Sequence, residues 1–400
     1  MVVTMLRSQS TTSETPLPYT ASPWDLMLED IRLVFRCYRY IPGILLPLSS
    51  ENSNDLDELH PSLRNFVNVI FQASLSLVQI LFLLSVPVLV VCQVPTLWTC
   101  VYIAGFVSAN QALCNLVLNR KPSVLTSRYP SRQMPEHEQE HWVFINGIAC
   151  GQTWMQKNID RLGLTFGRKV TGVHNPSAGL VFDLLQCLIQ RDFSYATQDV
   201  RDAYAIIRAS LLDPKYTKVV LIAHSQGGIE SGLIADWLLD ELPQCLLRKL
   251  EIYTFGNAAN HFNNPYRVLP RAQKDAANGE KPEDQKCSDK DHAILHIEHY
   301  ANSGDFVARW GVLNFANIPN RFIGHVFVRQ GSGHMMNQHY LGTMFPFGPG
   351  QKVRDSNPFV DSEIEVPTFG ANVPKSPVRR VKIREISRLW LYRNGGSPEQ

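Results

Sequence analysis

The stretch KVVLIAHSQGG, residues 218–228, decides the fold of this chain. After Lys218 its first residues are apolar and rich in β-branched side chains, which is typical of a buried strand. A helical pattern, GIESGLIADWLLDEL, follows at once. Ser225 therefore falls in a tight turn between a strand and a helix. Only small residues two places to either side of it, here Ala223 and Gly227, let the two elements approach so closely.

On both sides of this stretch, short apolar runs alternate with patterns of helical length. The runs WVFIN, KVTGV, LEIYTF, AILHIEH and HVFVR predict strands, and segments such as QTWMQKNIDRLGL and DVRDAYAIIRASLL predict helices. Strands and helices by turns predict a mostly parallel sheet with helices on both faces. We place this domain at residues 141–346, because the proline- and glycine-rich FPFGPG follows Met344.

The turn Ala223-His224-Ser225-Gln226-Gly227 resembles the GxSxG nucleophile elbow of the α/β-hydrolase superfamily. Ala223 departs from that pattern, because it replaces the first glycine with the next smallest residue. Such a string arises by chance roughly 0.1 to 0.3 times in a chain of this length, so the strand before it and the helix after it carry the resemblance. The resemblance implies an α/β-hydrolase fold and a serine nucleophile. A serine that only caps a helix is the alternative.

A serine hydroxyl needs a base to take its proton and an acid to orient that base. In α/β-hydrolases these residues follow the serine in the order acid, then histidine. Asp305, after the run AILHIEHY, looks like the acid loop of lipase-like relatives, although it could be a plain turn residue. His334 follows the last predicted strand and is the expected base, with His339 as the alternative. His224 is expected to point away from Ser225.

The resemblance also implies an oxyanion hole, which is a pair of N–H groups that bind the negative charge of a tetrahedral intermediate. One donor would be the N–H of Gln226. The second would come from WVFING, where Asn146-Gly147-Ile148 stands in the place of the His-Gly-x of lipase-like enzymes. We expect the N–H of Ile148, with that of Gly147 as an interchangeable candidate. A simple Asn-Gly turn is the alternative.

A cluster of potential metal ligands lies at residues 292–299, with His292, His296, Glu298 and His299. Alternation along a strand sends His296 and His299 to opposite faces. We therefore interpret these histidines as structural, and expect neither a metal nor an organic cofactor.

Residues 65–119 contain no Asp, Glu, Lys or Arg over 55 positions. One helix of that length would run roughly 80 Å, against a hydrocarbon core of roughly 30 Å. We therefore expect two membrane-crossing helices, at 66–92 and 97–118, with a turn at 93–96. A buried helical hairpin, or a shallow hairpin in one leaflet, is the alternative.

The flanks of this hairpin give its expected orientation. Positive charges cluster after the second helix and one abuts the first; they are Arg64, Arg120, Lys121, Arg128 and Arg132. By the positive-inside rule both ends face the cytosol, so the catalytic domain would be cytosolic, at the endoplasmic reticulum or a lipid droplet. Residues 1–20 lack the apolar core of a signal peptide.

Composition narrows the class of protein further. The 400 residues are 44% hydrophobic and 18% charged, with a net charge of +2, which excludes a strongly basic nucleic-acid binder. Eight cysteines without a CxxC pair indicate reduced, buried thiols. Outside the hairpin and the domain we expect a cytosolic N-terminal segment (1–64), a polar linker (120–140) and a basic tail (347–400). The tail could lie on a membrane, form an edge strand or be disordered, and residues 263–291 are expected to form a solvated loop.

Together these patterns predict a membrane-anchored serine hydrolase, similar to membrane-anchored lipase-like proteins of filamentous fungi. A lipid or another hydrophobic carboxylic ester is the expected substrate and the membrane the expected partner. The same residues would also serve an acyltransferase or a thioesterase. A non-catalytic membrane scaffold with this fold is the third hypothesis, since fold alone does not prove function.

Overall fold

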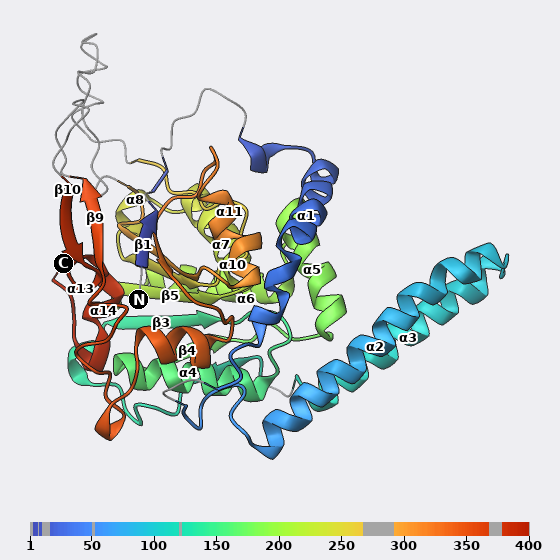
Figure 1. Cartoon of the computed structure of the whole chain (residues 1–400), viewed down its shortest axis with the longest axis horizontal. Helices are drawn as coiled ribbons and strands as arrows, with labels where there is room; N and C mark the ends of the chain where they lie inside the picture. The colour runs from blue at the N-terminus through green and yellow to red at the C-terminus, as the bar shows by residue number, and fades with distance from the viewer. Residues whose placement is uncertain are drawn as a thin grey trace, which may run out of the picture.

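An eight-stranded mixed sheet forms the centre of the computed structural model (Figure 1), in the order β1-β8-β7-β6-β5-β3-β4-β2. From β8 across to β4 all neighbours are parallel, whereas β1 and β2 pair antiparallel at the two edges. The strands are β1 (Val3–Leu6), β2 (Val124–Thr126), β3 (Glu140–Ile145), β4 (Val170–Val173), β5 (Lys218–His224), β6 (Leu250–Phe255), β7 (His296–Asn302) and β8 (His325–Arg329). The structure describes residues 3–6, 8–9, 17–49, 53–119, 122–266, 292–367 and 378–399.

Helices cover both faces of this sheet, and the predicted α/β-hydrolase fold is confirmed. They are α1 (Pro23–Cys37), α4 (Gln152–Phe166), α5 (Leu180–Phe193), α6 (Gln198–Leu212), α7 (Gly227–Glu241), α8 (Gln244–Leu247), α10 (Phe306–Trp310), α11 (Val312–Phe315), α12 (Gly342–Met344), α13 (Ile383–Ile386) and α14 (Arg388–Leu391).

Successive side chains along each strand point to opposite faces of the sheet, so the apolar core is divided between the two faces. On β3, Val143 and Ile145 pack with α5, α6 and α7, whereas Trp142 and Phe144 pack with α4 on the other face.

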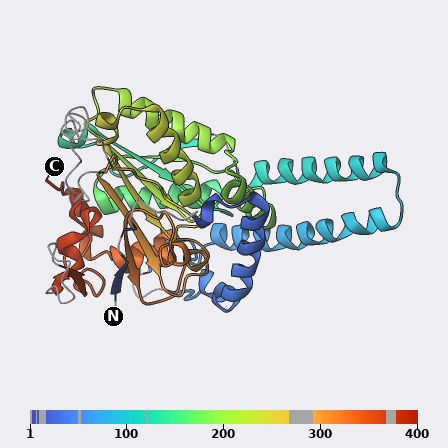
Figure 2. The same cartoon turned by 90° about the horizontal axis from the view of Figure 1, so that it is seen from above.

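The apolar tract of residues 65–119 forms a helical hairpin that extends away from the body (Figure 2). Its helices are α2 (Leu63–Val91) and α3 (Thr96–Val117), both long and apolar enough to cross a membrane. Ser62 caps α2 by accepting a hydrogen bond from the N–H of Asn65. Pro87 lies within α2 without ending it.

The N-terminal segment belongs to the body of the fold, which the sequence did not indicate. β1 extends the sheet beside β8, and the Gln9 amide donates to the carbonyls of Phe315 and Ile318, at 3.0 and 2.7 Å. Helix α1 buries Leu33 against the core, and its Asp30 forms an ion pair with Arg191 of α5. These pairings join residues far apart in the chain, so local sequence patterns do not reveal them.

The C-terminal segment also differs from the expected tail. Strands β9 (Glu363–Pro367) and β10 (Val378–Lys382) pair antiparallel, and α13 and α14 follow. Trp390 and Tyr392 are buried in the same core as Trp142. The apolar residues spread around a helical wheel because the segment is a strand followed by two short helices, and not one amphipathic helix. A disordered or membrane-bound tail is therefore wrong for residues 380–396.

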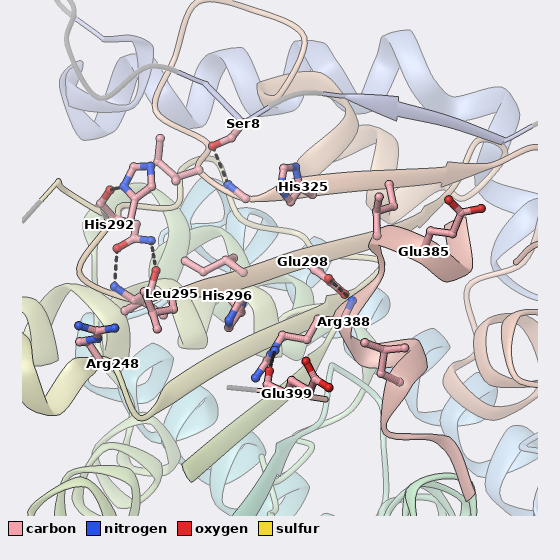
Figure 3. A pocket seen from close by; sticks show the side chains of 17 residues that line it. Ser8, Arg248, His292, Leu295, His296, Glu298, His325, Glu385, Arg388 and Glu399 are labelled. Atoms are coloured by element: carbon pink, nitrogen blue, oxygen red, sulfur yellow. Dashed lines mark hydrogen bonds between the residues drawn. The ribbon is translucent and has the colours of Figure 1, made fainter. Parts of the chain in front are cut away.

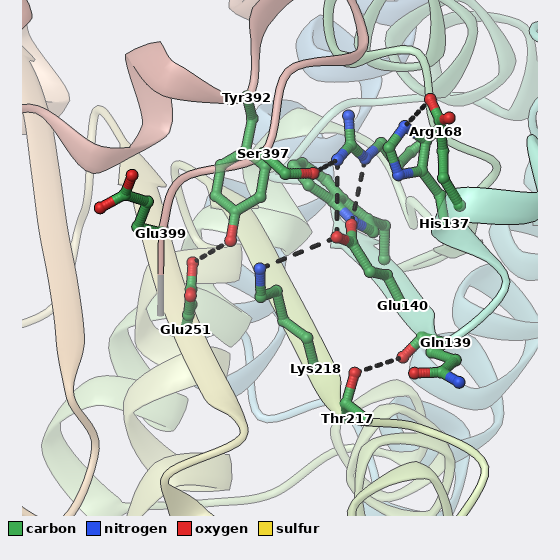
Figure 4. A network of polar contacts seen from close by, with 12 residues as sticks. His137, Gln139, Glu140, Arg168, Thr217, Lys218, Glu251, Tyr392, Ser397 and Glu399 are labelled. Atoms are coloured by element: carbon green, nitrogen blue, oxygen red, sulfur yellow. Dashed lines mark hydrogen bonds and ion pairs between the residues drawn. The ribbon is translucent and has the colours of Figure 1, made fainter.

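The positive charges of this segment meet buried carboxylates at the start of the parallel strands. Arg388 forms an ion pair with Glu251 at 2.9 Å, and the hydroxyl of Tyr392 donates to the same carboxylate at 2.8 Å. Nearby, Arg168 lies against Glu140 at 3.1 Å (Figure 4). The charge of Arg388 thus contributes to the folded core.

The predictions for the loop, the linker and the cysteines have different outcomes. Residues 267–291 lie outside the described residues, so the solvated loop stays a prediction. The predicted linker contains β2, an edge strand of the sheet. The cysteines at 37, 114, 150 and 187 are buried and free, as expected, whereas those at 92, 100 and 245 are exposed. Two of these exposed thiols belong to the hairpin, whose apolar surface is not covered by the body.

Candidate active site

Ser225 lies in the strained turn between β5 and α7 that its sequence predicts. Its φ of 60° is in the left-handed region, which costs a residue with a side chain on the order of 1–3 kcal/mol. Its N–H donates to the carbonyl of Phe255 at 3.0 Å, which holds the turn against β6. A Cβ at Gly227 would lie 2.6 Å from the carbonyl oxygen of Ile145, so only glycine fits there. The steric crowding that the sequence predicts at this position is thus present, and it explains the glycine.

Asp305 and His334 come together from loops that follow neighbouring strands, β7 and β8. The Nδ1 of His334 lies 2.8 Å from the Oδ2 of Asp305, and the carboxylate is fully buried. Two further groups donate to that carboxylate: the N–H of Val307 at 2.8 Å and the hydroxyl of Tyr340 at 2.6 Å. A carboxylate with these partners can orient an imidazole and stabilise its positive charge.

Tyr340 is a contributor to the site that the sequence did not reveal. Burial, and then the charge of Asp305, raise the pKa of its phenol well above the ordinary value, so it remains a hydrogen-bond donor. No local motif marks it, because its role depends on a packing contact between two loops.

His224 links the elbow to the loop that carries the predicted base. Its Nε2 donates to the backbone carbonyl of His334 at 2.7 Å, and the two rings lie 4.6 Å apart. Burial lowers the pKa of His224 well below its ordinary value, with the charge of His334 as a second cause. Its neutral imidazole therefore positions the base loop, a role that adjacency to Ser225 could have suggested.

The elbow and the acid–base pair approach each other around Gly256, directly after β6. A Cβ there would lie 2.9 Å from the Oδ2 of Asp305 and 3.0 Å from the Nδ1 of His334. Among the described residues, the structure records no hydrogen bond between the Oγ of Ser225 and His334. Such bonds are often long in enzymes without substrate and shorten when it binds.

His339, the alternative base, faces a different part of the molecule. Its Nδ1 accepts from the N–H of Met335 at 3.0 Å, and its Nε2 donates to the carbonyl of Pro47 at 2.8 Å. Both ring nitrogens are therefore engaged away from Asp305. The geometry favours His334 as the base.

The loop after β3 lies directly against the candidate nucleophile. A Cβ on Gly147 would be 2.4 Å from the Cβ of Ser225 and 2.9 Å from its Oγ. The side chain of Asn146 holds this loop, because its Oδ1 accepts from the N–H of Asn175 at 2.9 Å and its Nδ2 donates to the carbonyl of Gly147 at 2.9 Å. Asn146 thus replaces the expected histidine with a residue that fixes the loop through hydrogen bonds.

The two predicted oxyanion donors belong to this loop and to the start of α7. Within the described ranges, no acceptor in the protein is recorded for the N–H of Ile148 or of Gln226. The side chain of Gln226 is fixed, since its Oε1 accepts from Asn175 at 2.7 Å and its Nε2 donates to Gln190 at 2.5 Å. The positive end of the α7 dipole adds to the attraction for negative charge here.

The histidines at 292–299 contact protein groups. His299 bonds to the hydroxyl of Thr254 at 2.7 Å and to the carbonyl of Ile323 at 3.1 Å. Glu298 accepts from the N–H of Arg388 at 2.6 Å. Within the described residues no group of three or more His, Cys, Asp or Glu side chains is placed to hold a metal ion.

A cavity of about 540 Å³ lies at the other end of the sheet (Figure 3). His296 and His325, the first residues of β7 and β8, line it, whereas Asp305 and His334 follow the last residues of the same strands. This cavity is therefore not part of the candidate active site. Ser225 and His334 are themselves almost covered, with 3% and 6% of their surfaces exposed.

The comparisons with known proteins give distant structural likeness only. No model of a known protein family matches the chain, and no curated protein sequence matches it. It is similar to Trichoderma reesei cutinase in complex with a phosphonate inhibitor, at 20% identity and a TM-score of 0.20, over 30% of this chain and about half (52%) of the cutinase. It is also similar to the esterase Est22, at 12% identity and a TM-score of 0.29, over 59% of this chain and 81% of the esterase.

Proposed function

We propose that this protein is a membrane-anchored serine hydrolase that cleaves a lipid or another hydrophobic carboxylic ester. The observation that carries the proposal is the hydrogen-bonded pair His334–Asp305, which shares one end of the sheet with a serine in a left-handed turn. In this proposal Ser225 is the nucleophile, His334 the general base and Asp305 the residue that orients the base.

The reaction follows from these roles. The Oγ of Ser225 attacks the ester carbonyl carbon while its proton passes to the Nε2 of His334, and Asp305 stabilises the imidazolium. The N–H groups of Gln226 and Ile148 bind the oxyanion. The C–O bond to the leaving alcohol then breaks, the alcohol takes the proton from His334, and an acyl-enzyme remains. Water, deprotonated by His334, attacks the acyl group and releases the acid and Ser225.

The expected substrate class rests on the hairpin. Helices α2 and α3 are long and apolar enough to enter a membrane, and tethering at a bilayer raises the local concentration of lipid esters around the site. An acyltransferase would use the same residues but would transfer the acyl group to an acceptor alcohol or amine in place of water. The near-complete burial of Ser225 restricts water and a larger acceptor alike, so the fate of the acyl group has to be measured to separate the two candidates.

Hydrolysis of a panel of short- to long-chain esters by the full-length protein in detergent micelles tests the proposal. We expect turnover by wild type, no measurable turnover by Ser225→Ala, and wild-type rates for Ser210→Ala, which removes a buried serine on α6. Equal rates for wild type and Ser225→Ala would refute the nucleophile. Added long-chain alcohols separate the two candidates, because an acyltransferase would form new esters at the expense of free acid.

A further inference from the structure

The outer face of α1 carries an apolar stripe that the fold leaves uncovered. The stripe recurs at positions i, i+4, i+7, i+11 and i+14, which is one face of a helix. Its members, with their exposed fractions, are Trp24 (65%), Leu28 (50%), Ile31 (42%), Phe35 (72%) and Tyr38 (66%). The opposite side of α1 faces the body, where Leu33 and Cys37 are buried. Apart from Trp24, which contacts a ring of α5, the exposed stripe is therefore not needed for packing within the chain.

A charged stripe runs beside the apolar one. Its exposed members are Asp25, Glu29, Arg32, Arg36 and Arg39. Glu29 forms ion pairs with Arg32 and Arg36, and three of the five charges are positive. An apolar face next to a charged face with an excess of arginine is typical of a helix that lies in the interface of a bilayer with anionic lipids.

Helix α5 connects this stripe with the hairpin. Each exposed side chain on α5 is apolar: Leu184, Leu185, Ile189 and Phe193. The ring of Phe193 lies edge-on against Trp24 of α1 at 5.5 Å. Near the other end of α5, Phe182 contacts Phe82 of α2 and Phe106 of α3, each at 6.2 Å. One apolar surface thus extends from α1 over α5 to the hairpin.

The base of the hairpin is fixed to the body by a row of mostly polar side chains. The buried residues of α2 recur every three or four positions: Asn65, Asn68, Gln72, Leu75, Gln79 and Phe82. The amide of Gln72 donates to the carbonyl of Ala149 at 3.2 Å, and that of Gln79 donates to Ala178 at 2.6 Å. Asn110 of α3 donates to Ala178 at 2.8 Å. The hairpin is therefore fixed to the body as far as Phe82.

Only the tip of the hairpin extends beyond this attachment. From Phe82 to Val91 the helix continues for about nine residues, or ~14 Å, which is about half of a hydrocarbon core of roughly 30 Å. A full crossing takes about 20 residues, which would reach back from Val91 to Gln72. That depth would place the loop at Ala178, which Gln79 and Asn110 contact, inside hydrocarbon, where unpaired polar groups are costly.

We propose that the chain enters only one leaflet, with the hairpin tip in the hydrocarbon and the exposed faces of α1 and α5 in the interface. The occupant of this surface is the same lipid bilayer that receives the hairpin. The carboxyl ends of the parallel strands, after which Ser225, Asp305 and His334 follow, lie on the side of the body from which the hairpin extends (Figures 1 and 2). The inference rests on the membrane anchoring in the proposed function but not on catalysis.

Thiol labelling tests the depth of the tip. Full-length protein is reconstituted into sealed vesicles of phosphatidylcholine and phosphatidylserine, and a membrane-impermeant maleimide is added outside or enclosed inside. Exposed Cys245 on α8, away from the hairpin, is the internal control, and each cysteine is followed by peptide mass spectrometry. We expect Cys245 to react from the side of the body, and Cys92 in the tip to react only after detergent is added. Reaction of Cys92 from the side opposite the body would show a full crossing and overturn the proposal.

Tryptophan quenching tests the contact of α1. In a Trp98→Phe background, vesicles with lipids brominated near the headgroup should quench part of the fluorescence. We expect Trp24→Phe to remove much of the quenched component, and Trp237→Phe on α7 to leave it unchanged. An unchanged quenched component in Trp24→Phe would contradict the interfacial role of α1. Neither measurement needs turnover, so both can be made with Ser225→Ala as well as with wild type. A protein that inserts as proposed but hydrolyses no ester would contradict the proposed function and leave this inference intact.

Discussion

Gly147 is the residue where the space around the candidate nucleophile is tightest. Because a Cβ there would fall 2.4 Å from the Cβ of Ser225, Gly147→Ala must move the loop that carries Ile148, the proposed second oxyanion donor. We expect kcat to fall on the order of 10²- to 10³-fold, as it does when one oxyanion donor is lost, with little change in melting temperature. Gly105→Ala is the control, since a Cβ there meets nothing within 4 Å. An unchanged kcat for Gly147→Ala would show that this loop does not contribute to catalysis.

Glu58 makes stability depend on pH near neutrality. Its buried carboxylate accepts the N–H groups of Asn337 and Gln338, at 2.9 and 3.2 Å, and burial raises its pKa from 4.5 to about 7. Between these two values the unfolded chain loses the proton while the folded chain keeps it, so stability falls as pH rises. The fall ends above pH 7, where both states are ionised, and amounts to about 3 kcal/mol.

Melting temperatures of wild type and Glu58→Gln between pH 4 and pH 8, in one detergent, measure this effect. We expect the two curves to separate as pH rises, with wild type losing stability relative to the variant. Curves that remain parallel over this range would show that Glu58 does not titrate as expected.

At the residue scale, the sequence predicted the candidate site residues that belong to a recognisable motif. It missed residues that reach the site only through tertiary packing. Ser225 directly follows β5, and Asp305 and His334 lie in the loops after β7 and β8, so chain order and the carboxyl-end rule of parallel sheets indicate them. Tyr340 and His224 bond to the same loops through tertiary contacts that leave no periodic pattern. The contribution of Tyr340 could be found only with coordinates, whereas the position of His224 next to Ser225 could have suggested its role.

At the element scale, α1 depends on one buried arginine. Arg191 of α5 pairs with Asp30 of α1, donates to the carbonyls of Ala258 and Trp310 at 2.8 and 3.1 Å, and stacks on the ring of Trp310. We expect Arg191→Gln to destabilise the protein by about 3–5 kcal/mol, because it leaves a buried carboxylate without its partner.

Thermal unfolding and limited proteolysis of α1 measure this loss. Arg208→Gln is the matched control, since its ion pair with Glu241 is exposed and contributes at most about 1 kcal/mol. Equal melting temperatures for the two variants would show that Arg191 does not hold α1 in place.

Helices and strands with a clear hydrophobic periodicity were predicted well, whereas short elements without one were not. The strand and helix around Ser225 and the two helices of the hairpin follow from apolar runs and their lengths. β1 has four residues and pairs with β8 more than 300 residues away, and the C-terminal helices have four residues each. Such short elements owe their structure to tertiary contacts and not to their own sequence pattern.

At the scale of the whole molecule, segments near both ends of the chain complete the domain that the sequence predicts at residues 141–346. We expect a chain that ends at Pro346 to fail to fold. It would expose the aromatic core around Trp142 and leave the buried carboxylates of Glu251 and Glu298 without Arg388 and its neighbours.

The yield of monodisperse protein in size-exclusion chromatography measures this expectation. Arg380→Gln is the control, because it removes a positive charge from an exposed pair with Glu365. A folded, monodisperse protein that ends at Pro346 would show that the C-terminal segment is dispensable for folding.

Covalent labelling with a fluorophosphonate shows whether Ser225 is an activated nucleophile, since such a reagent reacts with a serine that a neighbouring base activates. We expect wild-type protein to gain one adduct on the peptide that contains Ser225, and Ser225→Ala to gain none. His334→Ala should label far more slowly. An unlabelled wild type, or an adduct on another residue that persists in Ser225→Ala, would contradict the account.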